Sequence, residues 1–99
     1  MSTPTPPPAR TDARVLYLTR AGCHLCEVAL PRVQQEARRA GTTVEVRDID
    51  AEGELTADWN DHVPVVVVDG AVHARYEVDA AALRAALAPR PFWRRWLGR

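Results

Sequence analysis

The chain has 99 residues, of which 46% are hydrophobic, and its 13 basic and 13 acidic side chains give a formal net charge of zero. This length allows one domain with a modest core. The balanced charge creates no overall field that would attract nucleic acid, and no apolar run approaches the length of a membrane span. We therefore expect neither a nucleic-acid-binding protein nor a membrane-spanning one.

Residues 1–13 are rich in proline and threonine and carry almost no large apolar side chain. We therefore expect an extended, disordered leader. The leader lacks the apolar stretch of a signal peptide, which predicts a cytoplasmic protein. In that compartment a closely spaced cysteine pair is more often catalytic or metal-binding than a structural disulfide.

An apolar run predicts a buried strand over residues 14–19. We expect a helix to follow from residue 23 or 24 to about residue 40 and to end at Gly41. Pro31 lies inside this helix and should bend it, because it removes one backbone hydrogen bond. The apolar stripe of the helix is predicted to contain Leu25, Val28, Ala29, Val33 and Ala37. Polar residues expected largely outside that stripe are Gln34, Glu36, Arg38 and Arg39.

Both cysteines of the chain, Cys23 and Cys26, lie at the expected start of this helix. The first turn of a helix has unpaired N–H groups and the positive end of the helix dipole, which favour a thiolate at Cys23. Cys26 lies about one turn further on, on the same side, where it can attack a mixed disulfide formed at Cys23. The sequence therefore predicts Cys23 as the nucleophile and Cys26 as the resolving thiol.

Two neighbours could assist this pair. Arg20 could bind a carboxylate of a partner through two hydrogen bonds, or it could be a solvated loop charge. His24 could stabilise the Cys23 thiolate as a cation, could join a metal site as a neutral ligand, or could be an exposed residue without a chemical role. We predict no resident metal.

A second strand is expected over residues 42–47, and a right-handed crossover would set it parallel to the first. Asp50 is then predicted to cap a short helix over residues 51–60. Within this helix, Leu55 and Trp59 lie one turn apart and should face the core.

Four valines at residues 65–68 predict a second buried strand. Asp69 and Gly70 form a two-residue hairpin signal, which predicts an antiparallel edge strand over residues 71–76. Asp79 is expected to cap a last helix that continues to about residue 88.

The predicted order β-α-β-α-β-β-α describes an α/β domain over residues 14–88, with a four-stranded mixed sheet and helices on both faces. Residues 89–99 form a tail of tryptophan and arginine. We expect its aromatic side chains to pack back on the domain, with contact to a membrane surface or an acidic partner as the alternative.

These motifs resemble the thioredoxin-fold superfamily, and within it the small glutaredoxin-like proteins of bacteria. The run from Cys23 to Cys26 matches the redox motif after the first strand, and Pro31 matches a proline that bends the helix. Val63 and Pro64 match the cis-proline dipeptide before the third strand. The resemblance implies a cis bond beside the cysteines, with the Val63 backbone pairing with an extended substrate. Alternatively, Pro64 is only the residue at which the strand begins, where its missing N–H does no harm.

The resemblance is incomplete at the positions that hold glutathione in glutaredoxins. Those proteins carry two glycines and an acidic residue after the fourth strand, whereas residues 75–79 contain no glycine. Asp79 could stand in for the acidic residue. A basic residue at the position of Arg20 binds an anionic partner in the family. The resemblance therefore leaves dependence on glutathione open.

Two functions fit the sequence. The first is a monomeric thiol–disulfide oxidoreductase that acts on a protein disulfide or a mixed disulfide. It needs no bound cofactor and would draw electrons from glutathione or from a thioredoxin-reductase-like flavoprotein. The second is a binding or assembly module that holds a metal or an iron–sulfur cluster between two chains, since two cysteines are too few for a four-thiolate site in one chain.

Overall fold

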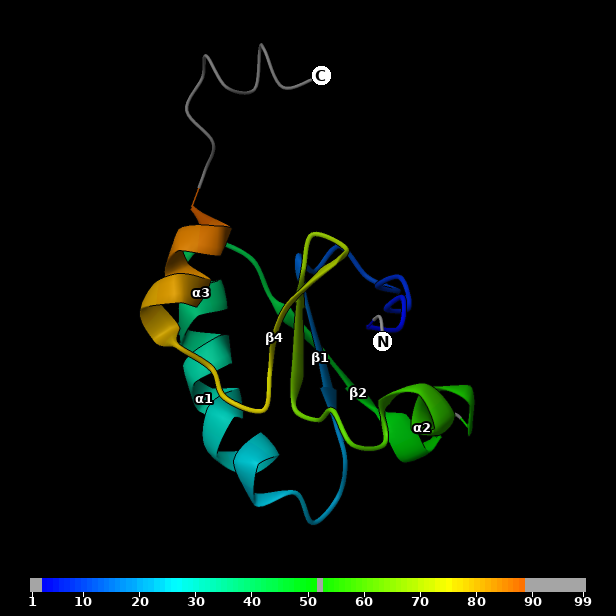
Figure 1. The fold of residues 1–99 in the computed structure, drawn as a ribbon. Helices are drawn as coiled ribbons and strands as arrows, with labels where there is room; N and C mark the ends of the chain where they lie inside the picture. Colours follow the sequence, from blue (N-terminus) through cyan, green and yellow to red (C-terminus); the bar gives the residue numbers. More distant parts are fainter. Residues whose placement is uncertain (1–2, 52, 89–99) are drawn as a thin grey trace.

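The computed structural model describes residues 3–51 and 53–88. It confirms the predicted element order and adds one short 3₁₀ turn, η1 (Figure 1). The elements are β1 (Val15–Thr19), α1 (His24–Arg39), β2 (Val44–Asp48), η1 (Ile49–Ala51), α2 (Gly53–Trp59), β3 (Val65–Val68), β4 (Ala71–Arg75) and α3 (Ala80–Leu87). The predicted packing of the tail, residues 89–99, lies outside the described residues.

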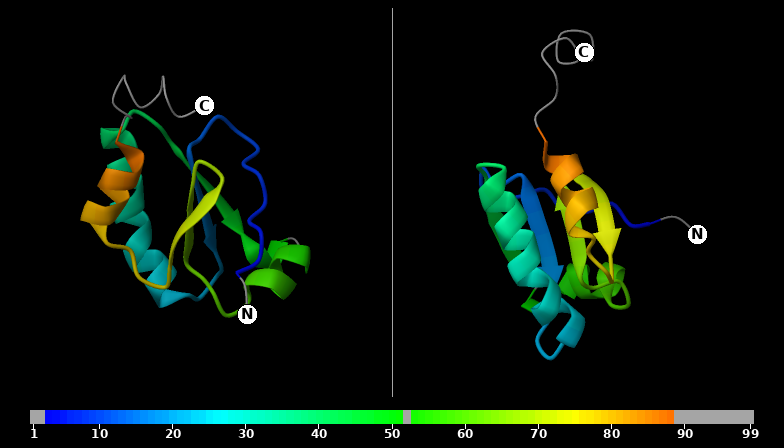
Figure 2. Two further views of the ribbon diagram at one scale, coloured as in Figure 1. Left: turned by 45° about the horizontal axis from the view of Figure 1, so that its top comes forward. Right: turned by 90° about the vertical axis from the view of Figure 1, so that its left-hand side faces the viewer.

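The four strands form one mixed sheet in the order β2-β1-β3-β4. β1 pairs in parallel with β2 and antiparallel with β3, and β3 pairs antiparallel with β4. Helices α1 and α3 cover one face of this sheet, and the short α2 lies on the other face (Figures 1 and 2). The central position of β1 matches its almost continuous apolar run, because a strand covered on both faces buries every side chain.

Two cores lie on the two faces of the sheet, because successive side chains of a strand point in opposite directions. Val15 and Tyr17 of β1 belong to the core under α1 and α3. Leu16 and Leu18 belong to the core under α2. Leu55 and Trp59 are buried in this second core, which confirms their prediction. No helix in residues 3–51 and 53–88 has the length and apolar character needed to cross a membrane.

The buried face of α1 differs from the predicted stripe. Leu25 and Val28 are 50% and 45% exposed, so the prediction that they belong to the stripe is wrong. Glu36 was expected outside the stripe, yet only 3% of it is exposed. The buried side chains of the helix are Cys26, Ala29, Val33, Glu36 and Ala37. The buried face of α1 therefore includes Cys26 and Glu36 in place of Leu25 and Val28, which the hydrophobicity of the sequence had indicated.

A long-range ion pair explains the burial of Glu36. Arg84 of α3 donates two hydrogen bonds of 2.9 Å to the two carboxylate oxygens of Glu36. This bidentate contact replaces the water that the carboxylate loses between the helices. The guanidinium also lowers the pKa of Glu36 from its ordinary value.

The hairpin and the last helix follow their sequence signals. Asp69 and Gly70 have φ angles of 50° and 86°, as a two-residue hairpin turn with two left-handed positions requires. The Asp79 carboxylate accepts hydrogen bonds from the N–H groups of Ala81 and Ala82 at 2.9 and 3.4 Å, which confirms it as the cap of α3.

The prediction that Asp50 caps α2 is wrong. Asp50 lies inside η1, where its own N–H donates to the carboxylate of Asp48 at 2.8 Å. The Asp50 carboxylate instead accepts hydrogen bonds from Arg20, which belongs to the loop after β1. Local sequence identifies a capping residue type, but it does not show a competing arginine 30 positions away.

The leader runs along the sheet face that α2 only partly covers (Figures 1 and 2). The N–H groups of Arg10 and Thr11 donate to one carboxylate oxygen of Glu45 in β2 at 2.7 and 3.0 Å. Arg47, also in β2, donates to the carbonyl of Pro8 at 3.2 Å. The composition of this segment gives no indication of these contacts.

Candidate redox site

The loop after β1 delivers Cys23 to the N-terminus of α1. Gly22 has a φ of +77°, a conformation that side-chain-bearing residues rarely adopt, and it turns the chain into the helix. Cys23 is the N-cap residue, and its Sγ accepts a hydrogen bond from the N–H of Cys26 at 3.2 Å. The sulfur therefore occupies the position at which a helix N-terminus binds a negative charge.

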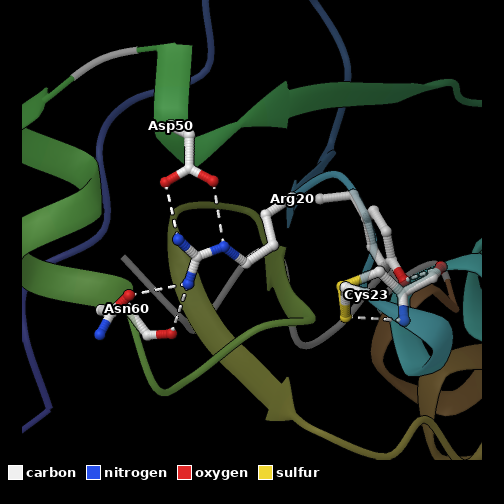
Figure 3. The surroundings of a disulfide bond; sticks show 6 residues. Arg20, Cys23, Asp50 and Asn60 are labelled. Atoms are coloured by element: carbon white, nitrogen blue, oxygen red, sulfur yellow. Dashed lines mark hydrogen bonds and ion pairs between the residues drawn. A yellow bond between two sulfur atoms is a disulfide. The ribbon is translucent and has the colours of Figure 1, made fainter.

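The two sulfurs are joined as a disulfide, and the Cα atoms of Cys23 and Cys26 lie 5.2 Å apart (Figure 3). Cys23 is partly exposed, whereas Cys26 is only 1% exposed and faces the core. Of the two cysteines, Cys23 is thus the one that an incoming molecule can approach. His24 is exposed on the first turn. In the described part of the chain, no three His, Cys, Asp or Glu side chains gather where they could hold a metal ion.

A buried tyrosine of the central strand is hydrogen-bonded to the first turn of α1. The O–H of Tyr17, in β1, donates to the backbone carbonyl of Cys26 at 2.7 Å. Burial raises the pKa of Tyr17 to about 12, so the phenol is a neutral donor at physiological pH. This role was not predicted. The available signal was a tyrosine inside an otherwise aliphatic buried strand, where its hydroxyl needs a partner.

The peptide bond between Val63 and Pro64 is cis, which confirms the expectation drawn from the resemblance. The antiparallel register pairs Leu18 with Val65, so this dipeptide lies at the same end of the sheet as the loop that carries the cysteines. Pro64 is buried, and its carbonyl accepts a hydrogen bond from the N–H of Tyr76 at 2.8 Å. Val63 is partly exposed.

Arg20 lies in the loop before the cysteines, but its guanidinium points away from them (Figure 3). It donates two hydrogen bonds to the Asp50 carboxylate, at 2.8 and 3.0 Å. It donates two more to Asn60, to the backbone carbonyl at 3.1 Å and to the side-chain oxygen at 2.7 Å. Of the predicted site residues, Arg20 is therefore the one whose side chain is bound by the chain's own acceptors.

Aromatic and basic side chains that precede and follow the cis-proline in the sequence contact one another in the fold. The ring of His62 lies edge-on to Trp59, with centroids 5.6 Å apart, and is stacked with Tyr76, with centroids 6.4 Å apart. Arg75 approaches Nδ1 of His62 at 3.0 Å. The cluster depends on the register between β3 and β4, so it could not be read from local sequence.

Comparisons with known proteins agree with this geometry. A family model described as Glutaredoxin-like domain (DUF836) matches residues 14–88. Two mycobacterial relatives are the uncharacterized proteins Mb0520 of Mycobacterium bovis and Rv0508 of Mycobacterium tuberculosis. Each is 33% identical over 84 residues, a match that covers 80% of this chain and 87% of the relative.

Solved structures show the same fold. Protein Ne2328 from Nitrosomonas europaea has a TM-score of 0.64 at 27% identity, covering 82% of this chain and 99% of that one. Protein XcR50 from X. campestris has a TM-score of 0.62 at 29% identity, covering 76% of this chain and 99% of that one. Thioredoxin 1 from Thermosipho africanus has a TM-score of 0.57 at 19% identity, covering 85% and 93% of the two chains, and shows the thioredoxin fold alone.

Proposed function

Because the chain belongs to the Glutaredoxin-like domain family and has a thioredoxin-like fold, we propose that it is a thiol–disulfide oxidoreductase. One observation carries this proposal. The disulfide of Cys23 and Cys26 lies at the N-terminus of α1, with the partly exposed Cys23 in the capping position and the buried Cys26 a turn later. This arrangement gives the two sulfurs different chemical tasks.

In the reduced protein, the Cys23 thiolate attacks one sulfur of a substrate disulfide. A mixed disulfide forms, and the other substrate sulfur leaves as a thiolate. Cys26 then loses its proton and attacks the Cys23 sulfur, which releases the second substrate thiolate and forms the Cys23–Cys26 disulfide. Two electrons pass from the protein to the substrate. The N–H of Cys26, which donates to the Cys23 sulfur, stabilises the attacking anion.

Substrate recognition is proposed for the cis-proline strand end. Val63 is partly exposed beside the buried Pro64, and its backbone would offer hydrogen bonds to an extended segment that carries the disulfide. The exposed imidazole of His24, when protonated, would favour the thiolate of Cys23. The substrate is a protein disulfide or a mixed disulfide. The protein acts as a cytoplasmic monomer without a bound cofactor and takes electrons from glutathione or a thioredoxin-reductase-like flavoprotein.

The proposal predicts different outcomes for the two cysteine variants. Cys23→Ser should reduce the catalysed reduction of insulin disulfides to the uncatalysed rate, because the nucleophile is lost. Cys26→Ser should still attack but should stop at the mixed disulfide, which mass spectrometry detects as a covalent adduct on Cys23.

Two results would contradict the proposal. Catalysis that survives in Cys23→Ser would show that the pair does not carry the reaction. Protein that is purified without oxygen and shows iron–sulfur absorbance, with iron shared between two chains, would support the assembly module instead.

A further inference from the structure

Arg20 is the arginine closest in sequence to the nucleophile Cys23, and its guanidinium is already hydrogen-bonded to acceptors of the chain itself. Nε and Nη2 donate to the two oxygens of Asp50, and Nη1 donates to both oxygens of Asn60 (Figure 3). These contacts use four of the five N–H groups of an arginine. The group bound by Nε and Nη2 is a carboxylate, which is also the group that an anionic substrate would offer.

The backbone turn that carries Asp50 is held by hydrogen bonds that do not involve Arg20. The N–H of Asp50 donates to the side chain of Asp48 at 2.8 Å, which fixes the η1 turn. The hydroxyl of Thr56 lies 3.2 Å from one carboxylate oxygen of Asp50 and 2.6 Å from the carbonyl of Ile49. The Asp50 carboxylate therefore lies against the guanidinium on a backbone turn that has its own hydrogen bonds.

We propose that Asp50 determines substrate specificity by denying Arg20 to anionic substrates, so that the protein favours disulfides without carboxylates beside the sulfur. The inference rests on the proposed oxidoreductase function. An external carboxylate must displace an internal one that is already aligned, and an intramolecular partner has a large advantage in effective concentration. A carboxylate-bearing disulfide thus gains little from Arg20 in this protein.

The surface around the cysteines fits the same preference. Leu25 and Val28 follow Cys23 on α1 and are 50% and 45% exposed. Tyr76, whose N–H binds the carbonyl of Pro64, is 43% exposed. These apolar side chains can cover the segment of a protein substrate that flanks its disulfide.

Two small disulfides of opposite charge test the inference. The reduced protein is mixed in stopped flow with oxidised glutathione, which carries carboxylates, or with cystamine, which carries only amines. We expect Asp50→Asn to raise the ratio of the glutathione rate to the cystamine rate about 3- to 10-fold, as an accessible guanidinium–carboxylate contact would provide. Because both rates are measured on one sample, a misfolded fraction cancels from the ratio.

Two further variants assign the gain to Arg20. Asp58→Asn removes one negative charge from an exposed position on α2 that is not a partner of Arg20, and it should leave the ratio within twofold of the original. In the double variant Arg20→Gln with Asp50→Asn, the gain should disappear. A ratio that does not change in Asp50→Asn while both disulfides still react would overturn the specificity role alone. No reaction of the reduced original protein with either disulfide would overturn the oxidoreductase function itself.

Discussion

At the scale of single residues, Tyr17 links the central strand to the redox helix. Its O–H donates to the Cys26 carbonyl inside the core. Tyr17→Phe should lower the free energy of unfolding by about 0.5–1.5 kcal/mol, the usual contribution of one hydrogen bond between neutral groups. Urea unfolding of the oxidised protein measures the change. An unchanged midpoint would show that the hydroxyl does not stabilise the helix.

The raised pKa of Tyr17 predicts how stability changes in alkaline solution. Burial raises its pKa to about 12 in the folded protein, whereas an unfolded tyrosine titrates near its ordinary value of about 10. The folded state thus binds more protons above that value, so the contribution of Tyr17 is complete below it and is lost as the pH rises through the folded pKa. The original protein should therefore lose more stability between pH 9 and pH 11 than Tyr17→Phe does.

The residues that the sequence identified are those whose chemistry is local. Cys23 and Cys26 are assigned by their spacing and by the helix start, and the cis bond at Pro64 by the family motif. In contrast, the partners of Tyr17 and Arg20 come from other elements of the fold. No local pattern indicates that a loop arginine will bind a carboxylate 30 positions later.

At the scale of elements, Gly41 ends α1. It has a φ of +78°, its N–H donates to the Arg38 carbonyl at 3.0 Å, and the N–H of Thr42 donates to the Ala37 carbonyl at 2.9 Å. This is the hydrogen-bond pattern of a Schellman motif, so the predicted end of the helix is confirmed.

Gly41→Ala should lower the free energy of unfolding by about 1 kcal/mol, because an added Cβ strains the left-handed conformation. No atom lies within 4 Å of that Cβ, so the strain is purely conformational. Gly53→Ala is the matched control, since Gly53 starts α2 without a left-handed φ and its Cβ also meets open space. Equal thermal shifts in the two variants would contradict the conformational explanation.

The contact of Glu36 with Arg84 joins α1 to α3 and should make their packing sensitive to acid. Hydrogen bonds from Arg84 hold the pKa of Glu36 below its ordinary value. Stability from this carboxylate is therefore present above the ordinary pKa of about 4.3 and is lost as the pH falls through the folded pKa. Glu36→Gln should be less stable than the original at pH 7, and the difference should shrink toward pH 3. A difference that stays constant between pH 7 and pH 3 in urea unfolding would contradict this role.

At the scale of the whole molecule, the order of elements could be predicted because each element carries its own period, turn residues and caps. The rotation of α1 about its own axis, which decides which of its side chains are buried, could not be predicted. Its stripe was drawn from hydrophobicity, which placed Leu25 and Val28 inside and Glu36 outside. In the structure Cys26 and Ala29 take the core-facing positions of the first two turns, so Leu25 and Val28 face solvent, and α3 supplies Arg84 as a partner for the buried Glu36.

The leader is the segment whose contribution to the whole domain was least evident from the sequence. Residues 10 and 11 donate three hydrogen bonds to one carboxylate oxygen of Glu45, through two backbone N–H groups and the Thr11 hydroxyl. Arg47 donates to the second oxygen of Glu45 and to the Pro8 carbonyl. These contacts tie the leader to the outer strand β2, on the face that α2 leaves partly open.

Two truncations measure how much the leader stabilises the domain. Removing residues 1–11 should lower the free energy of unfolding by about 1–3 kcal/mol, because the buried side of Glu45 loses hydrogen bonds that a charged acceptor makes strong. Removing residues 1–6 leaves Pro8, Arg10 and Thr11 in place and should change stability by less than about 0.5 kcal/mol. Urea unfolding of the three proteins gives both values. If the longer truncation is as stable as the full chain, the contacts with β2 do not hold the leader in solution, and the domain is complete without it.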